Sequence, residues 1–309
     1  MNRVAAVAAV RGLALGDAFG EAWLLRPAAE FESAVLERRL PDGPWPWTDD
    51  TAMALSVLRT LDRHGHIDQD VLATAFADAY AEDPYRSYGG SMHEVLRAIG
   101  QGEPWPVVTR RKFGGMGSWG NGAAMRVAPL GAWFADDLDA VTVQATRSAE
   151  VTHAHPEAVA GAVAVALAAA AAVRGAPAGD LITTVAAGTP DSEVASRLRR
   201  AARIAPSADP RHVAGMLGCG EQISAVDTVP YAIWCAARHL DDLTEALWAT
   251  VLPGGDTDTT CAIAGGIIAA RTTLAGIPSA WLTACEPLPP WLTPEPDTAA
   301  DDDNQPWPD

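Results

Sequence analysis

The chain has 309 residues and is 49% hydrophobic, which is sufficient for a large buried core. Its formal net charge of -17 argues against general binding to nucleic acid or to anionic membranes, because like charges repel. The four cysteines (Cys219, Cys235, Cys261 and Cys285) form no CxxC pair, which argues against a zinc or thioredoxin-like site and favours a reducing, cytoplasmic location.

Helical periodicity dominates the chain, and regular strand alternation is scarce. Runs rich in Ala, Leu and Met predict helices at 51–61, 71–80, 91–99, 157–173, 192–202, 231–240, 243–252 and 259–274. Gly and Pro clusters at 41–46, 100–106, 114–122, 175–179 and 253–255 predict the intervening loops. We therefore expect a compact, single-domain, multi-helix all-α fold.

Two apolar stretches raise the question of membrane insertion. The longest, 158–173, is shorter than the ~20 residues that a membrane span needs. Its Ala content and Gly161 favour a helix at the centre of a bundle, closely approached by its neighbours. Near the N-terminus, Arg11 and Asp17 interrupt the apolar run before a signal sequence could form. We expect neither a transmembrane segment nor a membrane partner.

The C-terminal end differs in composition from the rest. No basic residue follows Arg271, and the chain from Glu286 onward is rich in acids and prolines. Such a segment buries little apolar surface. We predict a catalytic domain at 1–285 and an acidic, loosely ordered tail at 286–309, in a protein that we expect to be a monomer.

Two clusters of Thr and Asp each precede a predicted helix, at 47–51 and at 254–260. One interpretation is helix capping, because these side chains accept hydrogen bonds from free backbone N–H groups. A cap needs only one such residue, however, and adjacent carboxylates repel each other. If the clusters meet in space, cations would compensate the charge. Carboxylate and hydroxyl ligands suit Mg²⁺, Mn²⁺ or Ca²⁺ rather than zinc.

Five segments, in this order and spacing, resemble the ADP-ribosylglycohydrolase family, which includes the dinitrogenase reductase-activating glycohydrolase. They are the opening helix at 12–20 (GLALGDAFG), the first metal motif at 47–51 (WTDDT), the glycine loop at 120–126 (GNGAAMR), the histidine segment at 152–156 (THAHP) and the second metal motif at 254–259 (GGDTDT). Together they span residues 12 to about 270.

The resemblance implies a compact all-α fold with a binuclear Mg²⁺ or Mn²⁺ site. The ligands it implies are Thr48, Asp49, Asp50, Asp256, Asp258 and Thr259. It also implies hydrolysis of the glycosidic bond that joins ADP-ribose to an acceptor, which would be an ADP-ribosylated protein side chain or a related conjugate. Two metal ions suit that reaction because they can orient the ribose and activate water.

The glycine-rich segment 114–122 and the histidine segment supply the substrate-binding candidates. Bare backbone allows N–H groups to approach a diphosphate, although a GxGxxG match outside a βαβ unit is a weak signal. With the family resemblance we expect contacts from Ser118, Gly120, Asn121, Gly122 and His153. We expect His155 to be structural and Arg126 to pair with a buried carboxylate rather than with phosphate. Asp17 is expected to be a structural residue, or one that supports the ligands, near the metals.

One departure from the family concerns the attacking water. Many members have a glutamate four residues after the glycine equivalent to Gly20, and here that position is Leu24. The nearest acid, Glu21, is our candidate for the role; the alternative is an aspartate of the metal cluster, so the catalytic candidates are Glu21, Asp49, Asp50 and Asp258.

The same departure keeps other hypotheses open. A catalytically weakened ADP-ribose-binding module would retain the pocket, and a structural role for an enzyme fold is a third option. A serine hydrolase is disfavoured because the chain has no GxSxG motif. The acceptor is not readable from the sequence, and we expect loops at 20–46 and 85–113 to select it.

Overall fold

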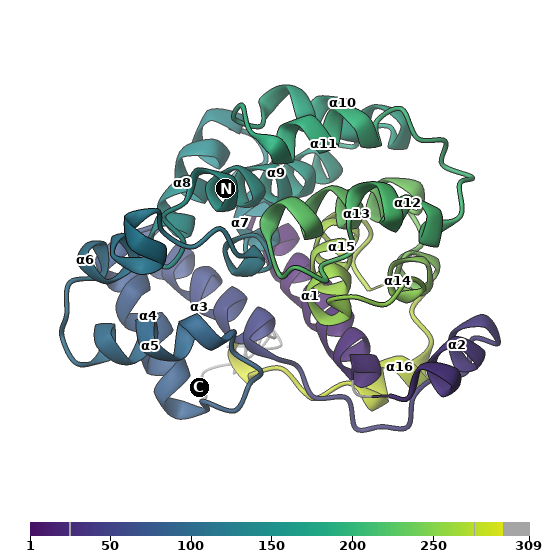
Figure 1. Ribbon diagram of the computed structural model, residues 1–309, viewed down its shortest axis with the longest axis horizontal. Coiled ribbons are helices and arrows are strands. Elements are labelled where there is room, and N and C mark those ends of the chain that lie inside the picture. The colour runs from purple at the N-terminus through teal and green to yellow at the C-terminus, as the bar shows by residue number, and fades with distance from the viewer. Residues whose placement is uncertain (25, 275, 293–309) are drawn as a thin grey trace, which may run out of the picture.

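The computed structural model describes residues 1–24, 26–274 and 276–292, and in these residues the chain is built from helices and loops without a β-strand. Figure 1 shows the helices packed around one another in a single body. Two isolated bridges, Trp45 with Cys285 and Gly120 with Ser224, are the only β-type pairings in the described part. The predicted all-α class is confirmed.

The helices follow each other along the chain with short connections. Their bounds are α1 (Arg3–Leu24), α2 (Ala28–Leu36), α3 (Asp49–His64), α4 (Gln69–Glu82), α5 (Gly90–Gly100), α6 (Trp105–Arg110), η1 (Lys112–Gly115), η2 (Asn121–Ala123), α7 (Ala128–Trp133), α8 (Leu138–Glu150), α9 (Pro156–Val173), α10 (Ala178–Gly188), α11 (Glu193–Ala201), α12 (Pro210–Leu217), α13 (Ala225–Arg238), α14 (Leu243–Val251), α15 (Thr257–Thr272), α16 (Ser279–Ala284) and η3 (Pro290–Leu292).

Helix α9 forms the centre of one half of the fold, packed against α7, α8, α10, α13 and α15. Its length and its mean hydropathy of 1.8 would allow it to cross a membrane, and no other helix in the described residues has both properties. However, 78% of this helix is buried inside the fold. A Cβ at Gly161 would lie 2.8 Å from the Ala225 Cβ on α13. The predicted close approach at this glycine is therefore confirmed.

The closest helix pair is α1 and α15, which run side by side through the middle of the molecule (Figure 1). Gly12, Gly16 and Gly20 recur every four residues and so lie on one face of α1. A Cβ at Gly16 would lie 2.1 Å from the Cys261 carbonyl oxygen, and one at Gly20 would lie 2.2 Å from that of Thr257. Only glycine allows the two backbones to meet at this distance.

This contact determines where the polar residues of α1 lie. Asp17 and Glu21 follow Gly16 and Gly20 directly, so they are carried to the N-terminal end of α15, where the second aspartate cluster begins. The Thr257 hydroxyl donates to the Gly20 carbonyl at 2.8 Å and closes the contact at this end.

Aromatic residues fill the space beside the other face of α1. Phe19 stacks on Trp281 with ring centroids 4.5 Å apart and meets Trp248 edge-on at 5.1 Å. Trp45 joins this cluster, and its backbone N–H donates to the Ala284 carbonyl while its carbonyl accepts from the N–H of Glu286. The chain after α16 is thereby tied to the loop that leads into α3.

The segment after residue 285 packs on the domain as far as it is described. Leu292 is buried, and the Arg59 guanidinium lies 5.6 Å from the centre of the Trp291 ring. The rest of the predicted loosely ordered tail, 293–309, lies outside the described residues. The domain boundary at residue 285 stays a prediction.

The close contact at Gly12, Gly16 and Gly20 of α1 leads to a first testable prediction. Gly16→Ala should destabilise the fold by about 1–3 kcal/mol, because the new methyl group would push α1 away from the α15 backbone. Chemical denaturation measures the change. The control is Gly215→Ala in α12, where a Cβ would meet nothing within 4 Å and alanine should be neutral or stabilising. Equal stabilities for the two variants would contradict the close packing.

Candidate active site

The first aspartate cluster lies at the N-terminus of α3. Thr48 is the N-cap residue, and its hydroxyl oxygen accepts from the Asp50 N–H at 3.3 Å. The capping interpretation is therefore correct for Thr48 but leaves the carboxylates of Asp49 and Asp50 without a capping role. Both side chains are buried.

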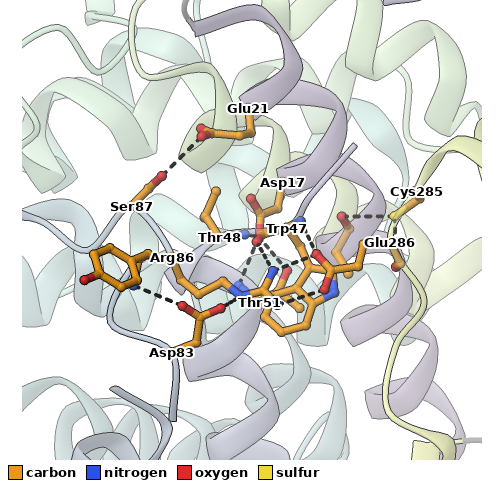
Figure 2. Close-up of polar contacts among 12 residues, drawn as sticks. Asp17, Glu21, Trp47, Thr48, Thr51, Asp83, Arg86, Ser87, Cys285 and Glu286 are labelled. Carbon is orange, nitrogen blue, oxygen red and sulfur yellow. Dashed lines mark hydrogen bonds and ion pairs between the residues drawn. The ribbon is translucent and has the colours of Figure 1, made fainter. Parts of the chain in front are cut away.

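Asp17 holds this cluster in place from α1. One of its oxygens, Oδ2, accepts from the backbone N–H of Thr48 at 2.9 Å, the N–H of Thr51 at 3.1 Å and the Thr51 hydroxyl at 2.5 Å (Figure 2). Asp17 is fully buried, and burial raises its pKa to about 6 although these bonds lower it. Asp17 thus has the structural role expected for it, and its other oxygen, Oδ1, has no hydrogen-bond partner among residues 1–24, 26–274 and 276–292.

The second cluster begins α15 and is held by backbone and amide groups. The Asp256 N–H donates to the Cys219 carbonyl at 3.1 Å, and the Asn121 side-chain amide donates to Asp256 Oδ2 at 2.5 Å. Asp256 stands at the N-cap position, yet its carboxylate makes no capping hydrogen bond. Capping therefore does not account for this cluster.

The fold brings the two clusters together. The Thr259 hydroxyl donates to Asp50 Oδ2 at 3.5 Å, across 209 positions of sequence. Burial, followed by the charges of Asp17 and Asp258, raises the pKa of Asp50 well above its ordinary value. The two clusters therefore meet, which is the condition that the sequence left open, and acidic groups are concentrated at the N-termini of two helices.

These residues fit a site for hard cations. Asp50 Oδ1 and Asp258 Oδ1 are buried oxygens with no hydrogen-bond partner in the described part of the chain, a costly arrangement unless a positive group meets them. Among the described residues, no three His, Cys, Asp or Glu side chains form a complete cage on their own. A site here would therefore also need the hydroxyls of Thr48 and Thr259, as in the ligand set that the sequence suggested.

A cavity of about 390 Å³ opens above the clusters and is lined by all five predicted substrate contacts. Its lining includes Asp49, Asp50, Asp256, Asp258, Thr259, Ser118, Gly120, Asn121, Gly122 and His153. Thr48 and Glu21 do not line it, but each is bonded to a neighbour that does: Thr48 to Asp50, and Glu21 to Ser87. Residues from segments far apart in the sequence thus converge on one cavity.

The glycine loop is shaped by its backbone. Gly114, Gly115 and Gly117 all have positive φ, as does Phe113 between them and α6. The Ser118 hydroxyl oxygen then accepts from the Gly120 N–H at 3.2 Å, and Gly120 bridges to Ser224. The loop joins helical segments, so the GxGxxG match is not a dinucleotide-binding turn.

The two histidines take different places. His155 is the N-cap of α9, and its Nδ1 accepts from the Glu157 N–H at 3.1 Å, which agrees with the structural role expected for it. His153 lines the cavity instead. The position of its ring explains why residues 120 and 122 are glycines. A Cβ on Gly122 would lie 2.9 Å from His153 Cε1, and a Cβ on Gly120 would lie 3.2 Å from His153 Nε2.

The expectation for Arg126 is wrong in its direct contacts. The buried guanidinium donates to the Ser148 carbonyl and to the Thr152 hydroxyl, and it lies 4.4 Å from the centre of the Phe76 ring. No carboxylate bonds to it in the described residues. Asp49 acts on it only through space, raising the pKa of Arg126 against the larger lowering caused by burial.

Comparison with known proteins agrees with this geometry. A family model described as ADP-ribosylglycohydrolase matches residues 2–305.

The chain belongs to the ADP-ribosylglycohydrolase family.

Similar proteins of this family are found in animals. The chain is 28% identical to the ADP-ribosylhydrolase ARH3 of Homo sapiens over 89% of this chain and 87% of that protein. It is 30% identical to the ADP-ribosylhydrolase ARH3 of Danio rerio over 90% and 85%. A solved structure, described as an ADP-ribosylglycohydrolase-related protein complex, superposes with a TM-score of 0.68 at 27% identity and covers 92% of this chain and 93% of its own.

The departure from the family pattern at Leu24 has a clear structural setting. Leu24 is the last residue of α1, and its side chain is 39% exposed. Glu21 is half-buried instead: its Oε1 accepts from the Ser87 hydroxyl at 3.1 Å, and its Oε2 is buried with no partner among the described residues. Burial raises the pKa of Glu21, the Ser87 bond opposes this, and Asp256 adds to the rise.

Several cavity residues were missed from the sequence. Phe113 and Trp119 lie at the cavity with their ring centroids 4.7 Å apart, and both are more than one-third exposed. Trp119 could have been found, because an aromatic residue inside a glycine-rich loop has few packing reasons to be there. Of the two expected acceptor loops, 85–113 supplies lining residues, whereas 20–46 supplies none among the residues described.

Arg86 links the first cluster to the C-terminal segment (Figure 2). Its Nη1 donates to the Trp47 carbonyl at 2.9 Å, and the guanidinium binds both Glu286 oxygens at 2.6 and 2.8 Å. It also stacks 3.6 Å from the centre of the Trp47 ring, and the Arg86 carbonyl accepts from the Asp49 N–H. Arg86 therefore connects the segment after α16, the loop that leads into α3 and the segment that carries Ser87.

Removing the charge of Glu286 tests this connection. Glu286→Gln should cost about 1–2 kcal/mol of stability, because a partly buried bidentate pair is weakened. The control is Glu245→Gln, which loses an equivalent but more exposed pair with Arg38 and should cost about 0–1 kcal/mol. Urea denaturation compares them, and a loss for Glu286→Gln no larger than the control would contradict a supporting role.

Proposed function

We propose that this protein is a metal-dependent hydrolase that cleaves the glycosidic bond between ADP-ribose and an acceptor. The observation that carries the proposal is the convergence of two aspartate clusters, with unpaired buried oxygens, at the floor of the cavity that holds the glycine loop and His153. Family membership agrees with it.

Two divalent ions, Mg²⁺ or Mn²⁺, are the cofactors that this donor set would hold. The proposed ligands are Thr48, Asp49, Asp50, Asp256, Asp258 and Thr259. Hard oxygen donors suit these ions, which would polarise the ribose hydroxyls and an attacking water. The chain itself orients the donors: Asp17 fixes Thr48, and Asn121 fixes Asp256.

The remaining walls of the cavity suit ADP-ribose. The absence of side chains on Gly120 and Gly122 allows the diphosphate to approach the backbone, with Ser118, Asn121 and His153 beside it. The exposed rings of Phe113 and Trp119 offer a stacking surface for the adenine base. The ribose would then lie over the aspartates.

Glu21 is the proposed base for the attacking water. Glu21 does not line the cavity, but it is bonded to Ser87, which does, and its buried, unpartnered Oε2 would accept the proton of the water while the Ser87 hydroxyl holds Oε1 in place. Because its pKa is raised, the carboxylate is a stronger proton acceptor than an ordinary surface glutamate. Glu21 would thus act from the first residue after Gly20, in place of the family glutamate absent at Leu24.

The acceptor would be an ADP-ribosylated protein side chain or a small ADP-ribose conjugate. The acidic net charge disfavours a general nucleic-acid partner. We further propose that the protein acts as a monomer in the cytoplasm.

A panel of ADP-ribosylated arginine, serine and nucleobase substrates with Mg²⁺ or Mn²⁺ tests the reaction. At least one substrate should release ADP-ribose, and Glu21→Gln should lower kcat by about 10²–10⁴-fold with a small change in KM, since general-base catalysis contributes on that order. ADP-ribose release is followed chromatographically.

Other outcomes separate the alternatives. Tight ADP-ribose binding without turnover of any substrate would favour the catalytically weakened binding module. Binding of neither ADP-ribose nor Mn²⁺ would contradict both and favour a structural role.

Metal binding should depend on pH in a defined direction. The pKa values of Asp49, Asp50 and Asp258 are raised, so the folded state holds protons that the unfolded chain releases, and without divalent ions stability falls as pH rises through the folded pKa values. Cations compete with those protons. At alkaline pH, a Mn²⁺ concentration about a hundredfold above the Kd should add about 2.7 kcal/mol to the free energy of unfolding. The same concentration should add much less near pH 5, because binding is weaker there.

Thermal unfolding with and without Mn²⁺ at both pH values measures this effect. Asp256→Asn/Asp258→Asn should abolish the stabilisation by Mn²⁺ while leaving the helical circular dichroism intact. An equal Mn²⁺ effect at both pH values, or one retained in the double variant, would refute the site.

A further inference from the structure

A short chain of hydrogen bonds leads from the buried core to the cavity. Arg126 Nη2 donates to the Thr152 hydroxyl oxygen at 2.9 Å, and that oxygen lies 2.7 Å from His153 Nδ1. Arg126 and Thr152 are fully buried, and His153 is nearly so. The three side chains therefore form a sequence of contacts that bulk water does not reach, except at the far end of the imidazole.

The direction of these bonds follows from what each group can do. A guanidinium can only donate, so the Thr152 oxygen must be the acceptor of the first bond. The second proton of Arg126 Nη2 is used by the Ser148 carbonyl, at 2.7 Å. The Thr152 hydroxyl has a single hydrogen, and His153 Nδ1 is the only acceptor recorded for it in the described residues. Thr152 therefore donates to Nδ1.

The opposite arrangement leaves a buried group unsatisfied. If Nδ1 carried the proton, the Thr152 oxygen would accept from both neighbours, and its own hydrogen would have no partner. Buried donors without partners are disfavoured strongly enough to shift a tautomer ratio by on the order of tenfold or more. A doubly protonated ring has the same defect. Burial and the charge of Arg126 also lower the pKa of His153 to about 3, so the ring is neutral.

The proton of the neutral ring is then on Nε2, which lies on the cavity side. His153 lines the cavity, and the glycine loop leaves room for the ring, because side chains at Gly120 or Gly122 would crowd Nε2. Within the described part of the chain, no protein group bonds to Nε2. The free N–H is thus available to a ligand in the cavity.

We propose that Arg126 and Thr152 are positioning residues that hold His153 as its Nε2–H tautomer, so that His153 serves only as a hydrogen-bond donor to a ligand oxygen. This inference rests on the proposed function for the nature of the ligand, a phosphate or ribose oxygen of ADP-ribose. It excludes two other roles for His153. A nitrogen that carries a proton has no lone pair for a metal ion and cannot accept a proton as a base.

Nitrogen-15 NMR of the histidine side chains tests the tautomer directly in the free protein. His153 is identified among the 7 histidines by the signal lost in His153→Gln. The expected spectrum at neutral pH has a protonated Nε2 and an unprotonated Nδ1. A protonated Nδ1, or an averaged signal from both tautomers, would overturn the proposal, whatever the protein binds.

Two variants separate positioning from folding. Thr152→Val removes the hydroxyl with little change of shape, so the His153 signals should shift towards a mixture of tautomers, and the Kd for ADP-ribose should rise by about tenfold. Thr152→Ser keeps the hydroxyl and should retain the wild-type spectrum and affinity. Calorimetry with ADP-ribose gives the Kd, and circular dichroism reports the fold.

The outcomes distinguish this inference from the proposed function. An unchanged His153 spectrum and unchanged affinity in Thr152→Val would overturn the positioning role. Should that variant not fold, the wild-type spectrum and the serine variant still decide the matter, since a Thr152→Ser spectrum that differs from wild type contradicts the proposal. A wild-type protein that fails to bind ADP-ribose would overturn the proposed function, while the tautomer is still read from the free protein.

Discussion

The site depends on direct backbone contact between α1 and α15. Three glycines spaced four residues apart make that contact possible, because any side chain at Gly16 or Gly20 would occupy the space of the α15 backbone. The contact places Asp17 and Glu21 at the N-terminus of α15. If α1 and α15 were further apart by the width of one methyl group, the two aspartate clusters would also be further apart. The packing of these two helices therefore sets the geometry of the candidate site.

The consequence of this packing is a concentration of buried carboxylates, which is unfavourable by itself. The protein offsets part of the cost with local hydrogen bonds: Asp17 collects three donors through one oxygen, and Asn121 serves Asp256. The N-termini of α3 and α15 add favourable dipoles, but only of the order of 1 kcal/mol each. Within the described part of the chain, the protein does not compensate the buried oxygens of Asp17, Glu21, Asp50 and Asp258 that are left unpaired. These unpaired oxygens are the reason why the aspartate clusters are a candidate cation-binding site.

Support for the site comes from segments that carry no catalytic group. Glu286, after the last α-helix, fixes Arg86, whose backbone in turn holds the N–H of Asp49. On the opposite side, Arg126 reaches the cavity only through Thr152. In both cases the guanidinium group of an arginine bonds to groups that lie behind the site rather than to groups that line the cavity. The cavity is thereby left with acidic oxygens, bare backbone and neutral donors.

The sequence by itself determined the helical class, the presence of capping residue types before α3 and the residue types able to hold hard cations, because these follow from local periodicity and ligand chemistry. Four of the five family segments also identified in advance the aspartates, glycine loop and histidine of the cavity, but not its walls at 87–92, 113 and 222–223. Only the tertiary structure decided that residues 48–50 and 256–259 meet, that Arg126 binds a hydroxyl rather than a carboxylate, and that Glu21 rather than Leu24 turns inward. Those facts depend on how closely α1 and α15 approach and on which long-range partners they bring within bonding distance. Local sequence does not encode such distances, since each is the result of packing among segments far apart in the chain.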